Sequence, residues 1–156
     1  MPKRWLALSV SGAEIIILDV EISGGGVATV LMDDTWTAQS NEPAGYQIMY
    51  QRICDYIRDK KIEKVVIKAS AVVPRKPATL ALLKSAELRG AVAAAAAASC
   101  ADVVFQAKAN ASRTGGDRTV DEYVKDDAFW KSKLTANILR KGSRELAYLL
   151  LVEAGR

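Results

Sequence analysis

Apolar runs of strand length alternate with short polar turns at the start of the chain. The runs cover residues 5–10, 14–22 and 27–32, and they are rich in Ile and Val, as strands are. Asp33 and Asp34 are expected to end the third run, followed by a polar link over 35–41. Because the turns between the runs contain glycine, the pattern predicts an antiparallel meander. The glycine triplet is not a phosphate loop, since a strand and not a helix follows it.

Two predicted helices and two predicted strands follow the meander. The apolar residues at helical spacing that predict an amphipathic helix are Tyr46, Met49, Tyr50, Ile53 and Ile57. Residues 65–67 form the next predicted strand, and two prolines make 69–77 a loop. The segment 78–98 predicts a helix that is apolar on all sides from Gly90 onward, so it must be covered on more than one side. Residues 103–105 then predict a short buried strand.

The last part of the chain is predicted to be helical after a basic loop. Residues 108–118 carry glycines and basic side chains and are expected to form a flexible loop. Thr119 with Glu122 fits a capping box that opens a helix. The apolar positions that predict one or two helices ending at Gly142 are Tyr123, Phe129, Trp130, Leu134, Ile138 and Leu139. The closing helix is expected over 143–153.

The order of these elements predicts the fold class. The meander is followed by two strands that each come after a crossover helix, and a helix closes the chain. This order predicts an α/β fold with a mixed five-stranded sheet flanked by helices. No internal repeat or composition shift divides the chain, so we expect one domain over residues 1–156.

Composition excludes functional classes more than it identifies one. Hydrophobic residues make up 50% and charged residues 26% of the sequence, as in a globular protein. The chain has no histidine, which excludes Ser-His-Asp and Cys-His catalysis and His-ligated zinc. Cys54 and Cys100 are expected to be buried, reduced thiols. No signal peptide or membrane span stands out, so we expect a cytoplasmic protein, and the net charge of +4 is compatible with nucleic acid as a partner.

Four stretches resemble the RuvC-like branch of the ribonuclease H-like superfamily. They are WLALSVSGAEIIILDVE, EKVVIKAS, AELRGAVAAAAAA and GSRELAYLLLVEA. The first two resemble a hairpin and a fourth strand that each carry an acid at a strand end. The third resembles the Arg-Gly-Ala and Ala-rich helix of RuvC-type resolvases, and the last resembles the closing helix with its acids. The chain is similar above all to a small group of bacterial RuvC-like proteins of about this length with degenerate catalytic acids.

The resemblance implies where catalytic acids should stand. In nucleases of this fold, several carboxylates gather two divalent ions that activate water and stabilise the leaving oxygen. The former acid positions are Ser9 and Ser11 after the first strand and Lys68 and Ala69 after the fourth. On the closing helix, Glu145 remains. One carboxylate and a lysine cannot hold two metal ions. We therefore expect a catalytically degenerate domain without a cofactor, which binds branched or duplex nucleic acid, or a protein partner, without hydrolysis.

An active nuclease is the alternative. Glu14, Glu87 and Glu145 would then be relocated catalytic carboxylates that bind Mg or Mn. The competing interpretation of Glu14, Asp19 and Glu87 is that they belong to a solvated surface. The related actin-like ATPase group begins with similar hairpins, but it needs a glycine-rich phosphate turn and a second domain, so we place it last.

Basic residues near the expected cleft are candidates for contact with the phosphates of DNA or RNA. Lys68 would place a cation where a metal ion binds in the nucleases, or it simply closes a strand at the surface. The other candidates are Arg75, Lys76, Lys84, Arg89, Arg113, Arg118, Arg140, Lys141 and Arg144. The apolar Ala-rich helix also suggests a homodimer, which the resemblance to RuvC-like proteins implies as well.

Overall fold

A mixed five-stranded sheet organises the molecule, as predicted. The computed structural model describes residues 1–71, 74–135 and 139–156. The strands are β1 (Lys3–Ser11), β2 (Glu14–Ile22), β3 (Ala28–Thr37), β4 (Lys64–Lys68) and β5 (Val103–Gln106). The helices are α1 (Pro43–Lys60), α2 (Leu80–Ser99), α3 (Lys108–Thr114), α4 (Val120–Val124), α5 (Asp127–Lys133) and α6 (Lys141–Ala154). The strand order is β3-β2-β1-β4-β5, with β1 to β3 antiparallel and β4 and β5 parallel to β1.

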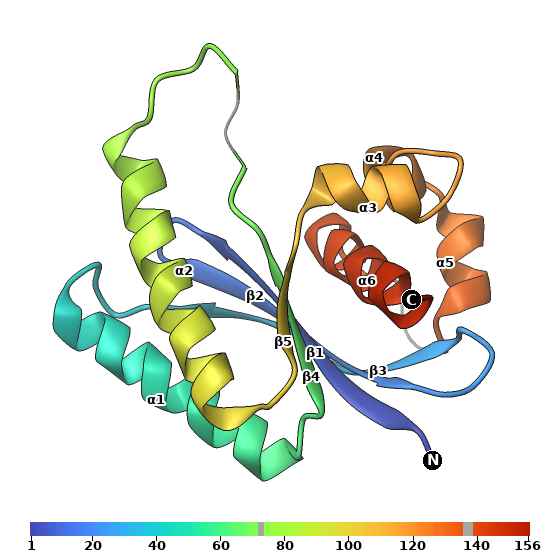
Figure 1. Cartoon of the computed structure of the whole chain (residues 1–156), viewed down its shortest axis with the longest axis horizontal. Helices are drawn as coiled ribbons and strands as arrows, with labels where there is room; N and C mark the ends of the chain where they lie inside the picture. Colours follow the sequence, from blue (N-terminus) through green and yellow to red (C-terminus); the bar gives the residue numbers. More distant parts are fainter. Residues whose placement is uncertain (72–73, 136–138) are drawn as a thin grey trace.

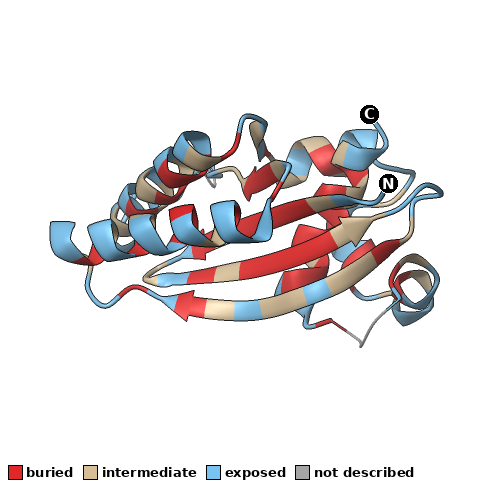
Figure 2. Cartoon of the chain, turned by 90° about the horizontal axis from the view of Figure 1, so that it is seen from below, coloured by how far each residue is buried: buried red, intermediate tan, exposed pale blue. Residues whose placement is uncertain are grey.

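The sheet separates two hydrophobic cores. Helices α1 and α2 cover one face and helices α3 to α6 the other (Figure 1). Because successive side chains of a strand point to opposite faces, β1 sends Leu6 and Leu8 toward α1 and α2, and Trp5 and Ala7 toward α6. Figure 2 shows the middle strands of the sheet largely buried, the outermost strand β3 mostly intermediate or exposed, and the outer sides of the helices exposed. Among the described helices, none is long and apolar enough to cross a membrane.

The structure corrects three predicted boundaries. Strand β3 continues to Thr37, because Trp36 pairs with Ile15 of β2 and buries its ring, so no polar link begins at residue 35. Residues 108–114 form helix α3 and not a loop. Gly142 lies inside α6 and does not end a helix. A Cβ at that glycine would lie 2.9 Å from Cδ1 of Ile16, so glycine lets α6 approach the sheet closely.

Helix α2 is covered on the sheet side and along α1, and is open elsewhere. Its buried residues include Leu88, Val92, Ala95 and Ala96. The first turn exposes Leu80, Leu82 and Leu83, whose exposed fractions are 71%, 56% and 54%. Helix α2 is therefore covered toward the sheet and along α1, whereas its first turn leaves an apolar stretch open to solvent.

Other predictions are confirmed locally. The capping box forms at the start of α4, where Thr119 accepts a hydrogen bond from the backbone N–H of Glu122 and the Glu122 side chain accepts one from that of Thr119. Cys54 and Cys100 are free, buried thiols. The predicted helical position Ile138, and residues 72–73 of the predicted loop, lie outside the described residues.

Candidate functional site

A row of polar side chains crosses three strands at the edge of the sheet where β1, β4 and β5 end. In β1, Trp5 and Ala7 face α6, so alternation places Ser9 and Ser11 on that same face. Val66 of β4 also faces α6, and so does Lys68. Three of the former acid positions, Ser9, Ser11 and Lys68, therefore share the face toward α6.

The register of the strands brings the members of this row side by side. Leu8 pairs with Ile67 in the parallel ladder, so the next residues, Ser9 and Lys68, stand at the same level. Lys68 in turn pairs with Gln106 of β5, which is almost fully buried. The backbone N–H of Ala69 donates to the carbonyl of Gln106 at 3.0 Å and extends the ladder by one residue.

Four charged side chains lie over this row, and we call them the lysine-carboxylate cluster: Lys68, Lys108, Asp121 and Glu145. Lys68 forms a close ion pair with Glu145, which projects from the second turn of α6. The ammonium nitrogen of Lys108 lies 3.9 Å from the other oxygen of Glu145 and 2.7 Å from Asp121. Two ammonium groups therefore flank one carboxylate.

The charges in this cluster reinforce one another. The hydrogen bond to Asp121 is the main cause that raises the pKa of Lys108, and the charge of Glu145 adds to it. The same hydrogen bond lowers the pKa of Asp121. Lys68 and Lys108 keep about a third of their side-chain surface, 32% and 34%, whereas Glu145 keeps 18%. The ammonium groups thus remain partly accessible above a largely covered carboxylate.

Two of the three carboxylates of the nuclease alternative, Glu14 and Glu87, lie outside the lysine-carboxylate cluster. Glu14 starts β2 opposite Ser11 and is exposed. Glu87 lies on α2, on the other side of the sheet, and accepts a hydrogen bond from the Tyr46 hydroxyl at 2.8 Å. Within residues 1–71, 74–135 and 139–156, no three His, Cys, Asp or Glu side chains form a group that would hold a metal ion. The two exposed glutamates fit the interpretation as surface acids.

Asp19 was expected on a solvated surface, and this is wrong. Its carboxylate is fully buried between β2 and α1. Arg4 donates to it from Nε at 3.0 Å and from Nη2 at 2.6 Å, and the Tyr56 hydroxyl donates at 2.5 Å. These contacts occupy both oxygens, so Asp19 is a structural acid away from the sheet edge.

Some of the basic candidates are exposed, and others form hydrogen bonds or ion pairs with neighbouring residues. Arg75, Lys76 and Arg113 are exposed. Arg89 of α2 donates to the Val10 carbonyl at 2.9 Å and to Ser70 at 2.6 Å, at the ends of β1 and β4, and burial lowers its pKa. Its guanidinium therefore reaches the same sheet edge from the side of α2.

Two further basic candidates form ion pairs within the helical layer; the Arg118 side chain is 40% exposed, whereas Arg144 is buried. Arg118 pairs with Asp126 at 2.9 Å and lies over the ring of Tyr123. Arg144 is only 5% exposed, pairs with Asp127 at 2.7 Å and donates to a backbone carbonyl at 2.8 Å. We correct the prediction for Arg144, because a side chain with so little exposed surface cannot contact a phosphate backbone.

Lys108 and Asp121 were missed as members of the site. The sequence position of Lys108 could have indicated its role, because it lies two residues after the end of β5, and parallel strands end at one edge of a sheet. Asp121 has no such signal. Its position depends on α4 folding back beside α3, which residue spacing does not predict.

Comparison with known proteins agrees with this architecture. No family model and no curated protein matches the chain. Among solved structures, Thermus thermophilus RuvC superposes with a TM-score of 0.68 and 14% identity, covering 97% of this chain and 93% of that one. Thermus thermophilus RuvC in complex with a Holliday junction substrate superposes with a TM-score of 0.69 and 13% identity, covering 97% of this chain and 92% of that one. The yeast mitochondrial Holliday junction resolvase superposes with a TM-score of 0.63 and 10% identity, covering 98% of this chain and 77% of that one.

These identities are too low to carry an activity over, but the superpositions span nearly the whole chain. The chain therefore has the RuvC-like form of the ribonuclease H-like fold, as the resemblance in the sequence predicted.

Proposed function

We propose that this protein binds nucleic acid at the sheet edge occupied by the lysine-carboxylate cluster and does not hydrolyse it. The observation that carries the proposal is the ion pair between Lys68 and Glu145, with Lys108 on the other side of the same carboxylate. The fold adds support, because the similar Thermus thermophilus RuvC was solved with a Holliday junction substrate. The nucleic acid is expected to be branched or duplex.

The charges suit a phosphate ligand without a metal ion. Bare carboxylates at a strand edge repel a phosphate backbone unless divalent cations bind first. Here the ammonium groups of Lys68 and Lys108 already balance the carboxylates of Glu145 and Asp121. Three exposed basic residues lie outside the cluster, in the loop after β4 and on α3, and can add further phosphate contacts: Arg75, Lys76 and Arg113. No cofactor is needed for this mode of binding.

A binding and cleavage assay tests the proposal. A labelled four-way DNA junction and a plain duplex are titrated in EDTA and in Mn²⁺, and each sample is then run on a denaturing gel. We expect binding in both buffers and intact strands. Cutting in Mn²⁺ that Glu145→Gln abolishes would contradict the proposal and establish the metal-dependent nuclease. Failure to bind either DNA, repeated with the matching RNA, would instead favour a protein partner.

Matched variants locate the binding surface. Lys68→Gln removes one cation from the edge, and each lost phosphate contact should lower the slope of log K against log salt by about 0.9. Lys60→Gln is the control, because Lys60 is an exposed lysine on α1, on the other face of the sheet. Equal slopes for the two variants would place the binding surface elsewhere.

We also propose that the protein forms a homodimer through α2. The open surface of this helix combines the exposed leucines of its first turn with small residues, Ala86, Gly90, Ala94 and Ala97, which allow a second backbone to approach. Light scattering should give twice the mass of the chain for the wild type and the mass of a monomer for Leu83→Glu. A monomeric wild type at high concentration would refute the dimer. A cytoplasmic location stays a prediction.

A further inference from the structure

A cavity of about 490 Å³ opens at the end of the molecule away from the lysine-carboxylate cluster. It lies between the turn of residues 22–26 that joins β2 to β3, the side chains of α4 and α5, and the last turns of α6. Glu145 lies near the start of α6, whereas the cavity is lined from Tyr148 to Gly155, near its end. The volume is within the range of about 300–1,000 Å³ that small-molecule sites occupy.

Three aromatic rings form one wall of this cavity. The rings of Tyr123 and Tyr148 stack with centroids 4.7 Å apart and an interplanar angle of 21°, and Phe129 lies 4.8 Å from Tyr123. Tyr123 is fixed in place, because its hydroxyl donates to Asp117 at 3.1 Å and Arg118 lies over its ring. A rigid aromatic wall is suited to a flat apolar ligand.

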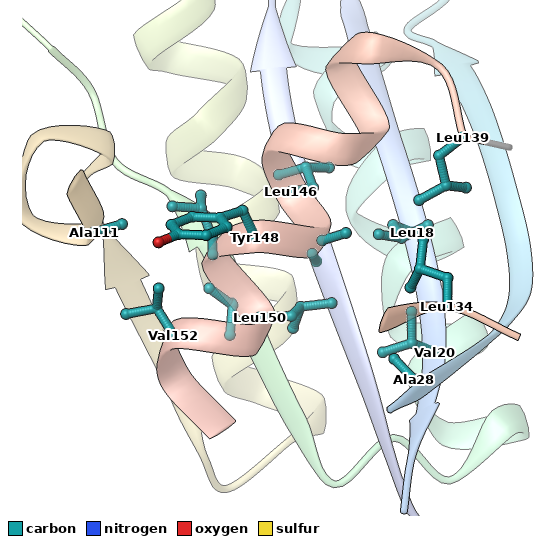
Figure 3. Close-up of a cluster of buried hydrophobic side chains, with 14 of the residues drawn as sticks. Leu18, Val20, Ala28, Ala111, Leu134, Leu139, Leu146, Tyr148, Leu150 and Val152 are labelled. Carbon is teal, nitrogen blue, oxygen red and sulfur yellow. The ribbon is translucent and has the colours of Figure 1, made fainter. Parts of the chain in front are cut away.

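The hydroxyl of Tyr148 is a buried hydrogen-bonding group without a partner. The residue is 2% exposed, and no hydrogen bond joins its hydroxyl to any described residue. Figure 3 shows the ring projecting from α6 toward α3, between Ala111 and Val152. A Cβ at Gly115 would lie 2.6 Å from the hydroxyl oxygen, so only a glycine at this position leaves room for the hydroxyl. Buried hydroxyls are normally satisfied, and this one has a donor to offer to a ligand.

Lys133 is the one charged side chain among the described residues that line the cavity. It extends from the last turn of α5, and its ammonium nitrogen lies 6.0 Å from the centroid of Phe129. The cavity therefore combines an apolar aromatic wall, one hydrogen-bond donor and one cation.

We propose that this cavity is a small-molecule site for a planar aromatic ring that carries an anionic group. The ring lies against the aromatic wall, Tyr148 donates a hydrogen bond to it, and Lys133 binds the anion. Nucleoside monophosphates and aromatic carboxylates share this chemistry. The site is separate from the proposed nucleic-acid surface, so the two proposals can be tested independently.

Isothermal titration of the full chain with three probes tests the site. The probes are adenosine 5′-monophosphate, adenosine as its neutral counterpart, and indole-3-acetate as an aromatic carboxylate. We expect saturable one-site binding of at least one anion, and binding of adenosine at least tenfold weaker than that of the monophosphate if the nucleotide is the ligand. The anion that binds more tightly identifies the source. Binding of neither anion at millimolar concentration would overturn the proposal.

Conservative variants separate this site from non-specific binding. Tyr148→Phe removes only the unpartnered hydroxyl, and Lys133→Gln removes the cation. Each should weaken anion binding at least fivefold, whereas Lys131→Gln, an exposed lysine of the same helix outside the cavity lining, should leave it unchanged. Equal affinities for all three variants and the wild type would also overturn the proposal. Tyr148→Phe keeps every described hydrogen bond of the fold, so loss of folding does not confuse the result.

Discussion

Replacing Asp19 by alanine should destabilise the fold strongly, although this residue lies away from the candidate site. The carboxylate is fully buried and accepts hydrogen bonds from Arg4 and Tyr56. It joins β1, β2 and α1 on one face of the sheet. The alanine variant leaves the guanidinium and the phenol hydroxyl without their shared acceptor.

The magnitude follows from burial. Removing one partner of a buried ion pair costs about 3–5 kcal/mol, because the other charge is left uncompensated. The Arg4 side chain is 30% exposed, so water can solvate part of its charge in the variant. We therefore expect a loss of about 3 kcal/mol in the free energy of unfolding for Asp19→Ala. Asp19→Asn keeps the shape and loses the charge, and should cost about half of that.

Urea unfolding followed by tryptophan fluorescence measures this loss, since Trp5 and Trp36 are buried and report on opposite faces of the sheet. The slope m should stay constant while the midpoint falls. Asp55→Ala, at an exposed acid of α1, is the control and should change stability by less than about 0.5 kcal/mol. A loss below about 1 kcal/mol for Asp19→Ala would refute the assignment of a structural role to this carboxylate.

Three further predictions concern other parts of the chain. Burial raises the pKa of Tyr148 to about 12, so the contribution of its neutral phenol to the free energy of unfolding is complete below about pH 10 and is lost as the pH rises toward 12. Denaturant titrations over this pH range should therefore show a smaller loss of stability for Tyr148→Phe than for the wild type. Equal losses would contradict the burial of the phenol. Thr119→Ala removes the cap of α4 and should cost about 1 kcal/mol by thermal unfolding, whereas Thr114→Ala should cost less. Cys54 and Cys100 should react with a thiol reagent only after denaturation, and fast labelling of the native protein would show that these thiols are accessible.

The fold could be predicted because its information is local. Periods of two and 3.6 residues, glycine turns and a capping box lie within short windows of sequence, and the order of elements then limits the sheet topology. Lys68 and Glu145 were found because each lies at a position where the resemblance expects an acid. Helix α3 was missed because its apolar residues are only alanines, it contains basic residues, and glycine follows directly after its last residue.

Asp19 shows what a sequence does not contain. Alternation places it on the same face as Ile15 and Ile17, which predicts burial, yet an isolated buried carboxylate is too costly to assume. Its partner Arg4 is 15 residues away, and Leu6 is the residue directly opposite Asp19, so Arg4 is a diagonal neighbour in the antiparallel register. The pair becomes visible only when the register is known. The cavity beside Tyr148 depends in the same way on segments from distant parts of the chain.

The central position of β1 has a consequence for synthesis on the ribosome. The meander of β1, β2 and β3 is made before the helices that cover its two faces, and these helices come from different parts of the chain. The face that carries Trp5, Leu18 and Val20 is covered by α6, which is made after β1 to β5 and the other described helices. Until α6 has been made, the nascent chain therefore exposes an apolar surface of the kind that chaperones bind and that leads to aggregation when synthesis stalls.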